Sequence, residues 1–216
     1  MTAFRFAVDL AGSLVVGMSA REYARAFMAT RLGDPTPRLW GRLSLNPKSW
    51  FDPFGSGLLA GMILLLWAAS ASFLPPPVAY AKPAPIDPNH FKNRTRDTVL
   101  TALAGPVANL TLGAVAGVGL RSGIGGDAAL ILLAFLLTNV SLLVFHLMPI
   151  PGLDGARIVG LALPPRAAEV YRNADQYLAL IVLIVLFLFA GPLISIVRSL
   201  TDSLCRLLAG FGCYPF

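Results

Sequence analysis

The stretch from Met18 to Phe27, MSAREYARAF, carries three charged side chains at helical spacing within an apolar run. With histidine at positions 21 and 25 it would match the pattern His-Glu-x-x-His, in which two histidines one helical turn apart hold zinc and the glutamate activates water. The chain keeps Glu22 but has Arg21 and Arg25 at the two ligand positions. A guanidinium group has five donors and no lone pair to give to a metal, so we expect no zinc at these positions.

The composition places this stretch in a membrane. Of the 216 residues, 56% are hydrophobic and only 13% are charged, well below the share of about 25% typical of soluble domains. We therefore expect an integral membrane protein made of one domain, residues 1–216. The formal charge of +6 does not indicate nucleic acid, because the basic residues are scattered singly. It favours contact with the headgroups of anionic lipids.

Apolar runs predict an all-α fold with about five transmembrane helices, each of roughly the length that a bilayer requires. After the first of these, the alternating piece GRLSLNP predicts a short strand, β-hairpin-like or re-entrant, which at membrane depth must be buried in protein or line a cavity. The last residues, 197–211, predict an amphipathic interfacial helix. The five expected spans are residues 6–30, 58–74, 98–120, 128–147 and 177–196.

Three further features leave alternatives open. With five spans, about eight basic residues fall on one side of the membrane and about seven on the other, so the positive-inside rule gives no orientation. Cys205 and Cys213 are too few for a disulfide framework and lack the spacing of a metal site. The first twenty residues also look like a signal peptide, although the apolar helix continues past the expected cleavage site.

Five stretches of the chain together resemble the site-2 protease family of intramembrane zinc metalloproteases, in its compact bacterial form without an inserted PDZ domain. They occur in the order and at the separations usual in that family, and they cover most of the chain from Arg21 to Ile158. The stretches are REYARAFMATRLGDPTPRLWGRLSLNP, FDPFG, AKPAPIDPNHFKN, ALAGPVANL and HLMPIPGLDGARI.

The resemblance implies a core of membrane helices around a zinc site. It places the two zinc-binding histidines of the family at Arg21 and Arg25, the general base at Glu22 and the third zinc ligand at Asp154. Without the histidines, Glu22 would be a vestigial base, and no cofactor is expected. Two more positions depart from the family: Trp50 stands in place of a histidine and His146 in place of an asparagine. The expected framework residues are Asn109, His146, Pro149, Pro151 and Gly155.

The charges on the first helix need partners. Arginines four residues apart share a helix face and repel each other, and charges at membrane depth are costly unless paired. We predict a buried ion-pair cluster of Arg21, Glu22, Arg25 and Asp154, whose charges sum to zero. Two alternatives are that the arginines extend into the headgroup region, or that a metal is held elsewhere by His146, Asp154 and Glu22. Asn109 and Asn139 are expected to form interhelical hydrogen bonds.

These features favour a catalytically inactive relative of the proteases, a pseudoprotease. It would bind a transmembrane segment or serve as a scaffolding or stabilising subunit for another membrane protein, in a bacterial plasma membrane. An extended partner segment would dock by edge pairing along Gly41, Arg42, Leu43, Ser44, Leu45 and Asn46. The alternatives are an active intramembrane metalloprotease, which would need zinc, and a transporter whose buried charges mark an ion path.

Overall fold

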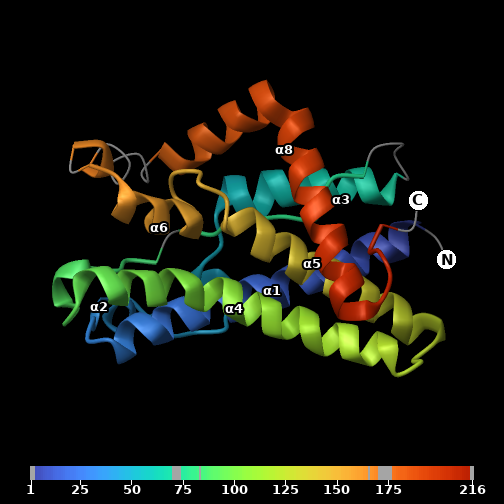
Figure 1. Ribbon diagram of the computed structural model, residues 1–216. Coiled ribbons are helices and arrows are strands. Elements are labelled where there is room, and N and C mark those ends of the chain that lie inside the picture. The colour runs from blue at the N-terminus through green and yellow to red at the C-terminus, as the bar shows by residue number, and fades with distance from the viewer. Residues whose placement is uncertain (1–2, 70–73, 83, 165, 170–176, 215–216) are drawn as a thin grey trace.

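Figure 1 shows a computed structural model of the chain, which describes residues 3–69, 74–82, 84–164, 166–169 and 177–214. Within these ranges the secondary structure is entirely helical, without a β-strand. The elements are α1 (Ala3–Arg31), α2 (Thr36–Leu39), η1 (Pro47–Ser49), η2 (Pro53–Leu59), α3 (Ala60–Ala68), η3 (Pro88–His90), α4 (Arg94–Arg121), α5 (Gly126–His146), α6 (Asp154–Ala162) and α8 (Leu178–Ala209).

Three of the described helices, α1, α4 and α5, are long and apolar enough to cross a membrane. The chain is therefore an all-α, multi-pass integral membrane protein. The expected count of five spans is not supported. The second expected span falls on the shorter helical stretch Pro53–Ala68, since α3 ends at Ala68. The fifth falls in the first part of α8, a helix with a proline inside it, Pro192, and several side chains outside the described residues.

Close approach of α1, α4 and α5 depends on small residues. A Cβ atom on Gly17 of α1 would lie 2.9 Å from the side-chain oxygen of Asn139 on α5. A Cβ on Gly113 of α4 would lie 3.2 Å from a methyl group of Val140. Such positions let helix backbones approach closely where lipid offers no hydrophobic driving force for association. Large side chains fill the space around these contacts, among them the fully buried Leu10, Met18, Leu136, Leu137 and Leu142.

The hairpin expected in GRLSLNP is wrong. The backbone of this piece forms local turns. The N–H of Gly41 donates to the carbonyl of Arg38 at 3.1 Å, and the N–H of Arg42 donates to the carbonyl of Pro37 at 2.8 Å. The side chain of Asn46 caps η1 by accepting from the N–H of Lys48 at 3.0 Å. Alternation of apolar and polar residues predicts a strand only where a partner strand is present, and the described residues supply none.

An extended segment, 74–82, runs beside α3 instead. The N–H of Lys82 donates to the carbonyl of Trp50 at 2.9 Å, and the hydroxyl of Ser56 donates to the carbonyl of Tyr80 at 2.9 Å. The Tyr80 ring packs directly against Gly55, and a Cβ atom on that residue would lie 2.3 Å from a ring carbon. These contacts fix Trp50 and the first turn of η2 to residues 80–82 of the extended segment.

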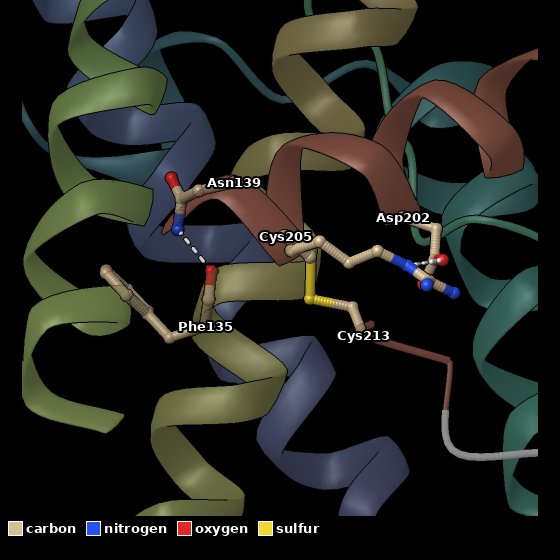
Figure 2. The surroundings of a disulfide bond; sticks show 6 residues. Phe135, Asn139, Asp202, Cys205 and Cys213 are labelled. Carbon is tan, nitrogen blue, oxygen red and sulfur yellow. Dashed lines mark hydrogen bonds and ion pairs between the residues drawn. A yellow bond between two sulfur atoms is a disulfide. The ribbon is translucent and has the colours of Figure 1, made fainter. Parts of the chain in front are cut away.

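The C-terminal segment folds back on α8. The helix ends at Ala209, and the next residue, Gly210, has a φ of +88°, the left-handed conformation that terminates many helices. The chain then returns and Cys213 forms a disulfide with Cys205, as Figure 2 shows. Both cysteines are fully buried and belong to the main hydrophobic core. The tail expected as a separate interfacial helix is thus continuous with α8 and closed by one disulfide.

Candidate functional site

The turn between α5 and α6 brings an aspartate back to α1. Gly152 has a φ of +92°, which reverses the chain after the two prolines of this turn. The backbone at Gly155 packs so closely on the end of α5 that a Cβ there would lie 2.1 Å from the carbonyl oxygen of Leu147. Asp154, the first residue of α6, therefore points to the side of α1 that carries Arg21 and Arg25.

Four side chains form one ion-pair network, which we call the charge cluster: Arg21, Glu22, Arg25 and Asp154. An Arg21 nitrogen (Nη2) lies 2.5 Å from Oδ2 of Asp154, and Nε of Arg25 lies 3.1 Å from Oδ1 of the same carboxylate. Arg21 also pairs with Oε1 of Glu22, and Nη1 of Arg25 lies 3.5 Å from that oxygen. Each guanidinium thus contacts both carboxylates, and the formal charges cancel.

The charge cluster is sealed from solvent. Arg21 and Arg25 are only 2% and 4% exposed, so the alternative in which they extend into the headgroup region is wrong. Burial by itself would raise the pKa of the Asp154 carboxyl, but the guanidinium groups of Arg21 and Arg25 outweigh that effect and hold the pKa below its usual range. Asp154 is therefore ionised and acts as the shared counter-ion of both arginines.

Neighbouring residues shape the space around the charge cluster. On α4, Gly105 faces the arginines: a Cβ there would lie 2.9 Å from Cγ of Arg21 and 3.2 Å from Cδ of Arg25. The indole N–H of Trp50 donates to the hydroxyl of Ser19 at 3.1 Å, which ties the end of η1 to α1. These contacts were missed by sequence reasoning, although the small residues of ALAGPVANL do predict a close helix approach near Gly105.

The expected framework residues lie on α4, at the end of α5, and in the turn and helix that follow α5. The Nδ1 atom of His146 lies 2.9 Å from the carbonyl of Leu142. Because a carbonyl can only accept, we assign the hydrogen to Nδ1 and the lone pair to Nε2, which is buried and has no hydrogen-bond partner among the described residues. Asn109 donates to Asn139 across 3.5 Å, the interhelical contact expected of them. Pro149 and Pro151 lie in the turn that precedes Asp154.

The residues at the family's metal positions do not fit zinc. Zinc needs lone pairs from imidazole, thiolate or carboxylate, whereas Arg21 and Arg25 offer only donors. Both oxygens of Asp154 already lie against guanidinium nitrogens. Elsewhere in the described part of the chain, no group of three or more His, Cys, Asp or Glu side chains could hold a metal. The described residues therefore do not bring His146, Asp154 and Glu22, the set proposed for a displaced metal, into a metal-holding group.

Glu22 on the apolar helix α1 and Asp154 of the Asp-Gly turn after α5 both pair with Arg21, so the motif positions of an intramembrane metalloprotease meet at one place. Over 185 residues the chain is 31% identical to "Putative zinc metalloprotease YwhC" of Bacillus subtilis (strain 168), covering 81% of this chain and 78% of that protein. It is 33% identical over 188 residues to "Putative zinc metalloprotease Rip2" of Mycobacterium tuberculosis (strain ATCC 25618 / H37Rv), covering 85% of this chain and 67% of that one. The chain belongs to the site-2 protease family. No protein-family model and no solved structure matches it.

Proposed function

We propose that this chain is a catalytically inactive member of its family, which binds a transmembrane segment or another membrane protein without cutting it. The observation that carries the proposal is that two guanidinium groups occupy the family's metal-ligand positions and contact both carboxylates that the chemistry would need. The residues of a metalloprotease site are thus engaged with one another.

Peptide hydrolysis by such a site needs two things that the charge cluster does not offer. The first is a metal that polarises the carbonyl and activates water. The second is a carboxylate available to take a proton from that water. Here Oε1 of Glu22 lies against guanidinium nitrogens of both arginines, so this oxygen is engaged in ion pairs. Glu22 is better suited to be a counter-ion than a general base.

A binding role is compatible with the charge cluster remaining in place. Buried ion pairs contribute little net stability but can fix the relative position of the elements that carry them. In this protein they hold the start of α6 against α1. The partners that we propose are membrane lipids and a membrane protein or transmembrane segment. The partly exposed loop at 41–46 stays a proposed contact region, with side-chain contacts through residues such as Leu45, 60% exposed, replacing the edge pairing of a strand.

Zinc content tests the proposal directly. The purified full-length protein and the double variant Arg21→His, Arg25→His would be dialysed against zinc and then against buffer, and their bound zinc measured by elemental analysis. We expect no stoichiometric zinc in the unmodified protein and about one ion per chain in the histidine variant, which regains a three-ligand set with Asp154. The double variant Arg21→Lys, Arg25→Lys is the matched control, because it keeps both charges and supplies no imidazole.

An active zinc metalloprotease is the second candidate, and the names of the relatives favour it. It predicts the opposite result, namely one zinc ion in the unmodified protein, together with cleavage of a reconstituted transmembrane reporter that is lost in Glu22→Gln. Either stoichiometric zinc or such cleavage by the unmodified chain would overturn our proposal. A transport role has less support, since the charge cluster is neutral and closed.

A further inference from the structure

The second half of α8, residues 193–209, presents three different faces. One face is buried in the core and carries Val197 and Cys205. A second face is apolar but exposed, with Ile196, Leu200 and Leu207 at 49%, 50% and 70% exposure. The third face is polar, and its residues recur every three or four positions, as expected for one side of a helix. They are Ser195, Arg198, Ser199, Asp202 and Arg206. We call this third side the polar face of α8.

A pocket of about 500 Å³ opens along the polar face. Its other wall is the C-terminal segment, which contributes Gly212 and Tyr214. The disulfide between Cys205 and Cys213 holds this segment against α8, with Asp202 nearby (Figure 2). A Cβ atom on Gly212 would clash with the carboxylate of Asp202, so helix and segment are in direct contact. The two walls are thus fixed to each other, and the volume lies within the range of about 300–1,000 Å³ typical of small-molecule sites.

Two arginines line the pocket, and neighbouring side chains position both of them. The guanidinium carbon of Arg198 lies 4.5 Å from the centroid of the Tyr214 ring, which in turn stacks on Trp67 at 6.4 Å. Stacking uses the face of a guanidinium, whereas its N–H donors point along its edge. Nε of Arg206 donates to Asp202 at 2.9 Å, which uses one of the five donors of that guanidinium. Both contacts are therefore compatible with further hydrogen bonds to a ligand.

The lining of the pocket favours an anion with a single charge. Arg198 and Arg206 contribute two positive charges and Asp202 one negative charge, which leaves one positive charge in excess. Arginine binds phosphate oxygens through paired N–H donors, and these charge-assisted hydrogen bonds are strong. The hydroxyl groups of Ser195 and Ser199 add further donors on the same wall. A phosphodiester, with one negative charge and several acceptor oxygens, matches this set.

The exposed apolar face of α8 indicates where that phosphodiester comes from. Ile196, Leu200 and Leu207 lie beside the polar face on the same helix. A soluble phosphate compound would leave these side chains uncovered, whereas the acyl chains of a phospholipid would cover them. The chain is also an integral membrane protein, so phospholipids surround it. Helices that join a polar face to an apolar one bind at the boundary between headgroups and acyl chains.

We propose that the pocket on α8 binds the headgroup of an anionic phospholipid. Arg198 and Arg206 hold the phosphate, and the acyl chains lie along the apolar face. The site is formed by residues other than those of the charge cluster. The inference goes beyond the proposed function, because a lipid site of this kind requires neither the absence of zinc nor the binding of a membrane protein. A result against it would leave the zinc measurement unaffected.

Lipid titration followed by native mass spectrometry tests the site. The purified full-length protein in non-ionic detergent would be titrated with phosphatidylglycerol, and the fraction carrying one lipid measured. We expect the variant Arg198→Gln, Arg206→Gln to bind at least tenfold more weakly, because it loses both phosphate-binding charges. The variant Arg38→Gln, Arg94→Gln is the matched control, since it removes the same charge from two other exposed positions. It should change the affinity less than twofold. Equal affinities of the two double variants would overturn the proposal.

A blocking variant keeps the test valid if the loss of Arg198 disturbs the fold. Ser199 lines the pocket and is exposed, so Ser199→Leu fills the pocket without removing a charge or a core contact. We expect its affinity for phosphatidylglycerol to fall at least fivefold, while its circular dichroism and its denaturation midpoint stay those of the unmodified protein. An unchanged affinity would show that the headgroup lies outside the pocket and would contradict the proposal.

Three other ligands separate the headgroup charge from the acyl chains. Phosphatidylcholine has the same phosphodiester but no net charge, and we expect it to bind at least fivefold more weakly than phosphatidylglycerol. Inorganic phosphate and glycerophosphoglycerol have no acyl chains, and we expect them to displace the lipid only at concentrations at least a hundredfold higher. Equal binding of phosphatidylcholine would refute the preference for an anion. Displacement by either soluble compound at the concentration of the lipid would indicate a site for free phosphate compounds and would refute the lipid assignment.

Discussion

The charge cluster and the disulfide are both buried cross-links, but they connect the chain on very different scales. The ion pair between Arg21 and Asp154 joins residues 133 positions apart, whereas the disulfide joins residues 8 apart. The first therefore determines where α6 lies relative to α1, and the second only folds a short tail onto α8. The non-covalent link thus controls tertiary structure, and the covalent link controls local structure.

The two links also differ in what their loss leaves behind. A broken disulfide leaves two small, nearly apolar side chains that a core accommodates. A broken ion pair leaves a charge that has been taken out of water and has no partner, which costs far more than the intact pair contributes. The charge cluster should therefore tolerate complete replacement better than partial replacement. The predictions below test this difference, beginning with the largest effect.

Removing the shared counter-ion should have the largest effect. Asp154→Ala leaves two buried guanidinium groups with only Glu22 opposite them, so we expect a loss of about 3–5 kcal/mol in the free energy of unfolding. Denaturant titration in detergent micelles measures it. Asp202→Ala is the matched control, because it removes a carboxylate from an ion pair with Arg206 whose side chains are 24% and 70% exposed. Such an exposed pair should cost at most about 1 kcal/mol.

A second variant distinguishes the lost charge balance from the lost packing. Replacing Arg21, Arg25 and Asp154 together by Met, Met and Leu, with Glu22→Gln, removes every charge from the charge cluster. We expect this variant to unfold at higher denaturant concentration than Asp154→Ala, since a packed apolar replacement is often close to neutral. Equal destabilisation of the two variants would show that packing, and not uncompensated charge, dominates at this site.

Removing the disulfide should have a smaller effect that is confined to its own region. Cys205→Ala with Cys213→Ala opens a short loop, for which chain entropy gives a loss of roughly 2–3 kcal/mol. Hydrogen exchange should rise at the end of α8 and stay unchanged around Arg21 and Asp154. The unmodified protein treated with reductant is the control. Faster exchange in α6 would show that the two links are coupled and would contradict the comparison.

The charge cluster was more accessible to sequence reasoning than the fold that surrounds it. Arg21 and Arg25 lie four apart on an apolar helix and require counter-charges, and the family motif supplies Asp154. Only the structure shows that Gly152 and Gly155 let the chain turn back far enough to deliver it. Sequence spacing indicates which charged residues need counter-charges, but it does not give the backbone path that brings them together.

The span count and the hairpin failed because both depend on long-range partners. Apolar residues over 58–74 predict a crossing by length alone, yet α3 ends at Ala68 and the following segment returns beside it. GRLSLNP has the alternation of a strand, but a strand exists only when another strand accepts its hydrogen bonds. Hydropathy and alternation are properties of one segment at a time. Whether a segment crosses the membrane or pairs as a strand depends on its contacts with other segments.

A single glycine provides the smallest and most specific test of how the charge cluster is packed. Gly105→Ala places a methyl group 2.9 Å from Cγ of Arg21 and 3.2 Å from Cδ of Arg25, and overpacking of this kind costs about 1–3 kcal/mol. Gly12→Ala in α1 is the control, because a Cβ there meets nothing within 4 Å and alanine is the better helix former by up to about 1 kcal/mol.

The arginine stems are flexible, but their guanidinium groups are held by Glu22 and Asp154, so the stems cannot move away without stretching those ion pairs. If Gly105→Ala proves as stable as Gly12→Ala in denaturant titration, the arginines have room to shift. The charge cluster would then be a less rigid link between α1 and α6 than its contacts indicate.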